Sequence, residues 1–197
     1  MNADHFIHNY VDRLNNEFMV ISNNDFNKEL IINSIDSFVK KDIKILRLFR
    51  INKFINFFYE KGLIPKTKIH YFFSFSKKAY MKDSGDLFLS IPFILSSNSA
   101  NFIITLIHEL SHLYLSNHND YKKLLLIDKM FFEVYGKNND TLLVSPVEYY
   151  ADAIMINTLN KVCENSEDNK KKMLIMKTLK IKTDYLQNIV NNWILNR

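Results

Sequence analysis

Apolar residues recur every three or four positions through most of this chain, which is the spacing of one face of an α-helix. In the first third of the chain, this pattern predicts helices at about residues 4–21, 26–39 and 42–61. The third of these helices is expected to end at Gly62, because a glycine followed by a proline, here Pro65, is a typical stop signal.

The period changes between residues 68 and 91, where aromatic and aliphatic residues alternate in part with polar ones. The segments 68–76 and 86–91 are expected to be strands, and a turn is expected at Ser84-Gly85-Asp86. Two strands connected through a turn region predict an antiparallel pair.

Helical spacing returns at about residue 99 and continues toward the end of the chain. Helices are expected at about 99–115 and 121–135, from Pro146 to about 163, and from about 167 onward. Long helices that flank a short run of strands favour the α+β class. We therefore expect a mostly helical, zincin-like fold in which a small antiparallel sheet packs on helix 99–115.

Length and composition favour a single domain with a full hydrophobic core, since 47% of the 197 residues are hydrophobic. We divide it into an N-terminal helical part (1–62), a core (63–165) and a C-terminal helix (166–197). The one cysteine, Cys163, has no partner for an internal disulfide, which fits a reducing cytoplasm. Because we find neither a signal peptide nor an apolar run long enough to span a bilayer, we expect a cytoplasmic protein with no membrane partner.

Lysines are concentrated near the C-terminus, within a modest net charge of +5. Apolar residues at helical spacing in the same segment predict a helix that packs on the protein and turns its lysines to solvent. No helix-turn-helix or zinc-finger spacing accompanies them, so nucleic acid is not expected as a partner. The lysines are Lys170, Lys171, Lys172, Lys177, Lys180 and Lys182, and the apolar residues are Ile175, Leu179, Leu186, Ile189 and Trp193.

The strongest chemical signal is the sequence His108-Glu109-Leu110-Ser111-His112 inside the predicted helix 99–115. Residues four apart share a helix face, so both imidazoles can bind one metal ion. Glu109 projects beside the pair, where it can act as a base on a water molecule. This H-E-x-x-H pattern is typical of zinc hydrolases, so zinc is the expected cofactor. The alternative is a buried helix whose histidines have only structural partners.

A catalytic zinc ion usually has three protein ligands, and Glu148 is the first candidate for the third. It follows Ser145 and Pro146, at the third position of a predicted helix. Asp152 lies four residues later on the same face, where its carboxylate can accept the N–H of a ligating histidine. The alternative interpretation of Glu148 is a capping-box residue with Ser145 as the N-cap.

Two other residues compete for the third ligand position. His118 falls at the metzincin offset from His112, but Leu115 occupies the place of the glycine that this pattern requires. Glu133 lies in the predicted helix 121–135, and Lys137 stands where a partner aspartate would be needed. Both candidates are expected to be surface residues instead.

The sequence His108-Glu-Leu-Ser-His-Leu-Tyr-Leu, with Glu148-Tyr-Tyr-Ala-Asp-Ala downstream, resembles the motifs of the ImmA/IrrE family of small zinc metallopeptidases. The resemblance covers about residues 102–156. It implies His108, His112 and Glu148 as zinc ligands, Glu109 as catalytic base and Asp152 in the second motif. The same spacing occurs in gluzincins more broadly. Ser111 replaces the usual glycine, and the gap between the two motifs is longer than the family leads us to expect.

Together, the motif and the resemblance predict a zinc metalloendopeptidase that cleaves a protein or peptide substrate, as regulatory proteolysis with a protein partner. Glu109 is expected to take a proton from the attacking water and to pass it to the leaving amine. Tyr114, Tyr149 and Tyr150 are candidate donors to the developing oxyanion. Extended substrate is expected to pair with one of the two predicted strands. The alternative is a metal-bound interaction module that does not cleave its partner.

Overall fold

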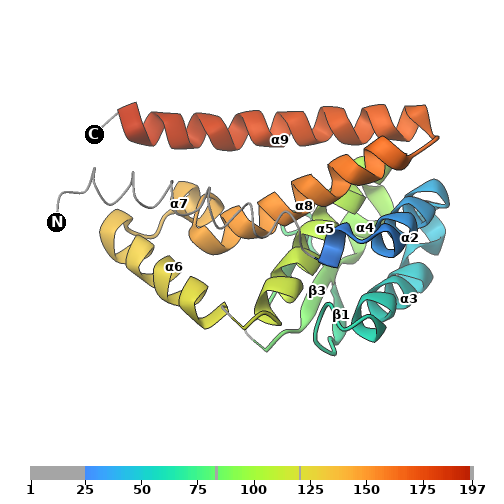
Figure 1. The fold of residues 1–197 in the computed structure, drawn as a ribbon, viewed down its shortest axis with the longest axis horizontal. Coiled ribbons are helices and arrows are strands. Elements are labelled where there is room, and N and C mark those ends of the chain that lie inside the picture. Colours follow the sequence, from blue (N-terminus) through green and yellow to red (C-terminus); the bar gives the residue numbers. More distant parts are fainter. Residues whose placement is uncertain (1–24, 83, 120, 196–197) are drawn as a thin grey trace.

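The computed structural model describes residues 25–82, 84–119 and 121–195, which form a mostly helical fold with one small sheet (Figure 1). This confirms the predicted α+β class. The helix predicted at 4–21 lies outside the described residues. In chain order the elements are η1 (Asp25–Asn27), α2 (Glu29–Lys40), η2 (Lys44–Leu46), α3 (Arg47–Glu60), β1 (Ile69–Phe72), β2 (Ala79–Met81), β3 (Leu87–Ser90), α4 (Ile91–Ser96), α5 (Ser99–Ser116), α6 (Tyr121–Tyr135), α7 (Asn139–Leu143), α8 (Pro146–Asn165) and α9 (Asn169–Leu195).

The helices predicted within the described residues are all present. α6 has the predicted bounds, and α3 ends just before Gly62, whose φ of 70° is the left-handed conformation that commonly closes a helix. Two short helices, α4 and α7, and the strand β2 were not predicted. α4, α7 and β2 span six, five and three residues, and segments this short do not show a repeat of apolar positions in the sequence.

The sheet is mixed, with strand order β1-β3-β2, so the predicted antiparallel pairing of 68–76 with 86–91 is wrong. β1 runs parallel to β3, with Ile69 opposite Leu87, and β2 runs antiparallel to β3. The cause is the unpredicted strand β2, which forms a tight hairpin with β3. In its turn Gly85, at a φ of 79°, donates its N–H to the carbonyl of Lys82 at 2.8 Å. The hairpin places β3 in the centre and leaves β1 and β2 as edges.

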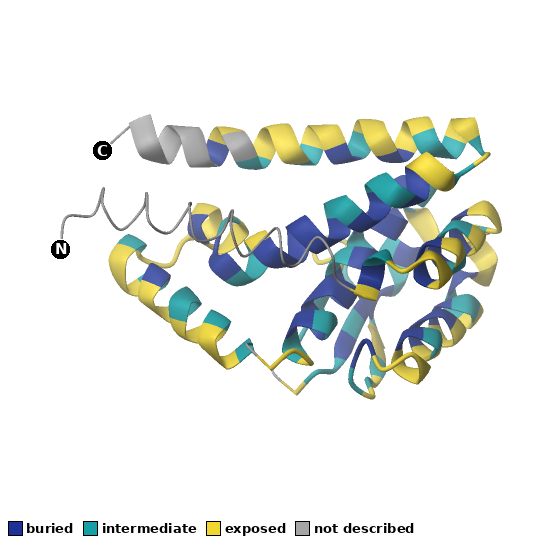
Figure 2. Ribbon diagram, in the orientation of Figure 1, coloured by how far each residue is buried: buried dark blue, intermediate teal, exposed yellow. Residues whose placement is uncertain are grey.

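Helix α5 occupies the centre of the core (Figure 2). Twelve of its 18 residues are buried and they surround the helix, which is the pattern of a helix enclosed by protein. α8 and α9 pack on α5, and so does β2. The buried residues Leu87 and Leu89 of β3 belong to the same core. The sheet therefore packs on the predicted active-site helix, and the H-E-x-x-H sequence is held inside the molecule.

The C-terminal helix α9 contacts both α8 and α5 (Figure 1). Ile175, Leu179 and Ile189 of the predicted apolar stripe are buried, which confirms that this face packs on the protein. Over the described ranges, we find no helix that combines the length and the apolar character needed to cross a membrane.

Candidate metal centre

His108 and His112 lie one turn apart on the buried helix α5 and face the same point. Their Nε2 atoms are 3.1 Å apart, and their rings are nearly perpendicular, at 85°. The side chains are mostly buried, with 14% and 9% exposed. The predicted sharing of one helix face therefore holds in three dimensions.

Glu148 completes a triangle of ligand atoms from the first turn of α8. Its Oε2 lies 3.2 Å from Nε2 of His108, and its Oε1 lies 3.3 Å from Nε2 of His112. Ligands bound tetrahedrally at 2.0–2.1 Å from zinc lie about 3.3 Å from one another. The observed spacing and the donor set, two imidazoles and a carboxylate, therefore fit a zinc ion. This is the group of potential metal ligands found among the described residues.

The start of α8 brings Glu148 to this position with help from α6. The side chain of Ser145 makes no cap hydrogen bond, so the capping box considered for Glu148 does not form there. Instead, Oδ1 of Asp128 on α6 accepts a hydrogen bond from the backbone N–H of Val147 at 3.1 Å. The carboxylate of Glu148 is thus free to face the histidines, while an aspartate from α6 provides an acceptor for one N–H of the first turn.

Asp152, one turn further along α8, contacts the opposite nitrogen of His108. Its Oδ1 lies 2.6 Å from Nδ1, and the residue is only 5% exposed. A carboxylate at this place holds a proton on Nδ1 and leaves the Nε2 lone pair for a metal. The same oxygen also contacts Nζ of Lys182 on α9. Burial alone would raise the pKa of Asp152, but these two partners hold it below its usual range.

The charges in this centre are strongly coupled. Burial acts to lower the pKa of His108, but contacts with Asp152 and Glu148 outweigh it and raise that pKa to about 9. Burial likewise acts to raise the pKa of Glu148, but the two histidines outweigh it and hold that pKa well below its usual range. In the absence of metal, a proton on His108 therefore balances the carboxylates, and metal binding must displace it.

Glu109 is also buried, with 7% exposed, and it feels the charges of both histidines and of Glu148. Burial raises its pKa above the usual range for a glutamate, and the histidines oppose this shift. A buried carboxylate with a raised pKa beside two histidines is a candidate for proton transfer.

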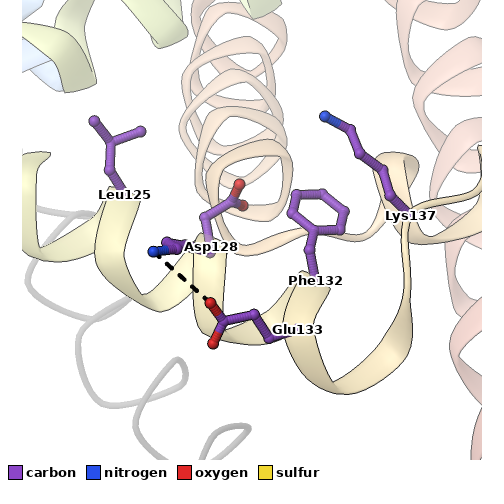
Figure 3. Close-up of a pocket in the computed structure, with 6 residues that line it drawn as sticks. Leu125, Asp128, Phe132, Glu133 and Lys137 are labelled. Atoms are coloured by element: carbon purple, nitrogen blue, oxygen red, sulfur yellow. Dashed lines mark ion pairs between the residues drawn. The ribbon is translucent and has the colours of Figure 1, made fainter.

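The competing ligand candidates lie elsewhere. His118 is exposed in the turn after α5, outside the triangle of ligand atoms. Glu133 is exposed on α6 and pairs with Lys129 at 3.8 Å, beside a shallow surface hollow of this helix (Figure 3). The hollow is lined by residues of α6, Glu133 among them, and by Lys137 just beyond its end, and its lining does not include His108, His112 or Glu148. Both residues are surface residues, as expected.

The three tyrosines considered for the oxyanion are dispersed. The ring of Tyr114 packs against that of Phe26 at 4.9 Å, and Tyr150 is 3% exposed within the core. Tyr149 is 37% exposed on α8, next to Glu148. Packing thus accounts for Tyr114 and Tyr150, and Tyr149 is the candidate with an accessible side chain.

The sequence did not predict two contacts near the centre, those of Asp128 with the N–H of Val147 and of Lys182 with Asp152. The sequence does indicate an inward-facing Lys182, because this lysine interrupts, at helical spacing, the apolar stripe Ile175, Leu179, Leu186 and Ile189. A charge on a core-facing stripe requires a partner in the interior. Asp128 had no comparable signal, because its bond to Val147 depends on how α6 meets α8.

Comparisons of this chain with protein-family models, with curated proteins and with solved structures find no match.

Proposed function

We propose that this protein is a zinc-dependent metallopeptidase of the gluzincin type, which hydrolyses peptide bonds of a protein substrate. The observation that supports this most is the triangle of His108 Nε2, His112 Nε2 and the Glu148 carboxylate, with edges of 3.1–3.3 Å, beside the buried Glu109. The resemblance of both motifs to the ImmA/IrrE family supports the same proposal. We propose further that this proteolysis is regulatory and takes place in the cytoplasm.

In the proposed reaction, His108, His112 and Glu148 hold the zinc ion. Zinc, when bound, polarises the attacking water and the peptide carbonyl. Glu109 takes the proton of that water and delivers it to the amine that leaves when the C–N bond breaks. The Asp152 carboxylate, 2.6 Å from Nδ1 of His108, would accept a hydrogen bond from Nδ1–H and so keep Nε2 available as a ligand.

The sheet suggests how an extended substrate is held. Segment 86–91 cannot accept a further strand, because β3 lies in the centre of the sheet. β2 is an edge strand that packs on α5, the helix of both ligand histidines. We propose that substrate backbone pairs with the free edge of β2, which would lay the chain along the metal centre.

The test compares wild type with Glu109→Gln, both loaded with zinc and matched in zinc content by elemental analysis. Each is incubated with a random peptide library and an unfolded protein, and cleavage is followed by mass spectrometry. We expect wild type to cleave and Glu109→Gln to be slower by about 10²–10⁴-fold, the usual contribution of a general base.

Three results would count against the proposal in different ways. Equal rates would remove Glu109 as the base. Absence of zinc binding by folded wild type would remove the metal centre. Full zinc occupancy without cleavage of any peptide or protein, including candidate partners, would favour the metal-bound interaction module.

A further inference from the structure

Lys182 lies on the face of α9 that packs on the protein. It lies at helical spacing with Ile175 and Leu179, which are buried against the protein, whereas Lys177 and Lys180 are exposed. Its side chain is 30% exposed and ends at Asp152. Lys171 also turns toward the protein, where its Nζ donates to the carbonyls of Val39 and Lys40, whereas Lys182 turns toward Asp152 and the candidate metal centre.

The contact continues into the ligand set through a single oxygen atom. Oδ1 of Asp152 contacts Nζ of Lys182 on one side and lies 2.6 Å from Nδ1 of His108 on the other. The Nε2 atom of the same imidazole faces His112 and Glu148. A continuous chain of charged contacts thus runs from α9 to the metal centre.

We propose that Lys182 is a positioning residue of the metal centre: it holds the Asp152 carboxylate 2.6 Å from Nδ1 of His108, where that carboxylate can accept a hydrogen bond from Nδ1–H. This inference rests on the proposed zinc site. It also assigns a role to α9, which through Lys182 becomes part of the support of the metal ligands. Because Lys182 lies behind His108, on the side away from the ligand nitrogen, it supports the centre without touching substrate.

The charge balance explains why a lysine is needed at this place. Three carboxylates, those of Glu109, Glu148 and Asp152, are gathered around the two histidines. A divalent ion offsets two of these charges, and Lys182 offsets the third. Without Lys182, the buried Asp152 would keep only His108 as a partner, and its carboxylate would be drawn toward water, because a buried charge needs full compensation.

The experiment measures zinc affinity by competition with a chromophoric chelator in wild type, Lys182→Met, Lys182→Arg and Lys182→Gln. Lys180→Met is the matched control, because it removes an exposed lysine from the same helix. We expect Lys182→Met to weaken zinc binding about tenfold, at the lower end of effects from groups behind metal ligands. Lys182→Arg should restore most of the loss, Lys182→Gln should lie between, and Lys180→Met should match wild type.

A double-mutant cycle separates positioning from other roles. If Lys182 acts through Asp152, Lys182→Met should have no further effect on zinc affinity in the Asp152→Asn background. Circular dichroism shows whether Lys182→Met alone folds. If it folds poorly, the double variant can still be compared with Asp152→Asn, because the double variant removes both charges of the pair. Lys182→Gln, which keeps a donor, is the second safeguard.

Each remaining outcome overturns the inference. Unchanged zinc affinity in Lys182→Met would mean that the pair only stabilises the fold. Tighter zinc binding would mean that Lys182 acts as a repelling charge. An undiminished loss in the Asp152→Asn background would mean that Lys182 acts independently of Asp152. If wild type binds no zinc, the proposed function fails first, and this inference falls with it.

Discussion

Two regions of this molecule bury charged side chains, and they do so in opposite ways. Around Arg47, which is fully buried, every group is matched. Its Nε and Nη2 donate to the two oxygens of Asp42 at 2.8 and 2.6 Å, and its Nη1 donates to the carbonyls of Ile94 and Ser97 at 2.7 and 3.0 Å. The guanidinium also lies 4.3 Å from the ring centre of Phe102. This cluster is closed and holds α3 to α4 and α5.

The metal centre is open by comparison. It gathers two imidazole nitrogens and two carboxylate oxygens, most of them acceptors, at nitrogen–nitrogen and nitrogen–oxygen distances of 3.1–3.3 Å. One proton cannot satisfy so many acceptors, whereas a metal ion can bind three of them at once. The difference teaches that burial of charge does not by itself mark a functional site. The mark is a convergence of acceptors in excess of the donors around them.

The largest expected effect comes from removing a ligand of the open cluster, which is the candidate metal centre. Glu148→Ala removes one of three ligands from a site whose binding free energy is on the order of 10 kcal/mol, so zinc affinity should fall by roughly three orders of magnitude. Elemental analysis after gel filtration and chelator competition measure this loss. His118→Ala is the matched control and should keep one zinc per chain. The reverse pattern would identify a metzincin-type site.

Breaking the closed cluster should affect the fold instead. Arg47→Met leaves the Asp42 carboxylate buried without its partner, so the free energy of unfolding should fall by about 3–5 kcal/mol. Urea denaturation measures it, with Lys44→Met as the exposed control, for which a change within about 0.5 kcal/mol is expected. The folded fraction of Arg47→Met should still bind one zinc per chain. Loss of zinc at unchanged stability would erase the distinction between the clusters.

The sequence alone could predict which residues of the open cluster, the candidate metal centre, share a helix face. His108 and His112 lie within one helix, and Glu148 and Asp152 lie within another, so the helical repeat alone predicts which side chains share a face. The structure brings these two helix faces together, so that the carboxylate of Glu148 lies beside the two histidines. Relations between residues of one continuous segment could therefore be predicted.

The rest depends on how distant segments meet, and no local pattern contains it. In the sequence Arg47 is one charged residue within a predicted helix, yet its partner Ile94 is 47 residues away. β2 is three residues long, and without it the parallel register of β1 and β3 could not be predicted. Lys182 was assigned to a solvated lysine face, because its neighbours at 177 and 180 do face solvent.

The two clusters should also differ in their response to alkaline pH. The pKa of His108 in the folded, metal-free protein is raised from 6.5 to about 9, so its stabilising effect is complete below pH 6.5 and is lost as the pH rises through 9. The loss in free energy of unfolding should approach about 3 kcal/mol. The Arg47 cluster contributes no such loss, because arginine keeps its charge and the pKa of Asp42 is lowered.

Urea unfolding between pH 6 and 9.5 tests this difference, with zinc removed by a chelator. His108→Gln should abolish the alkaline loss, and so should saturation with zinc, because metal replaces the proton. Zinc affinity should rise by about tenfold per pH unit up to about pH 9, as expected when one proton of His108 is released, and should level off above that pH. A stability profile identical in wild type and His108→Gln would show that His108 carries no extra proton.

The smallest expected effect tests the boundary between the two kinds of cluster, at Asp128. This residue caps α8 through the N–H of Val147 and so supports the fold, but it acts one residue before Glu148. Asp128→Ala should lower the free energy of unfolding by about 1 kcal/mol, as loss of a helix cap does. Glu133→Ala is the control on the same helix (Figure 3), since its exposed pair with Lys129 should contribute little.

If Asp128→Ala also weakens zinc binding while Glu133→Ala does not, the cap at the start of α8 belongs to the support of the metal centre. If zinc affinity is unchanged, the histidines alone suffice to orient Glu148, and Asp128 belongs with the closed cluster as a purely structural group.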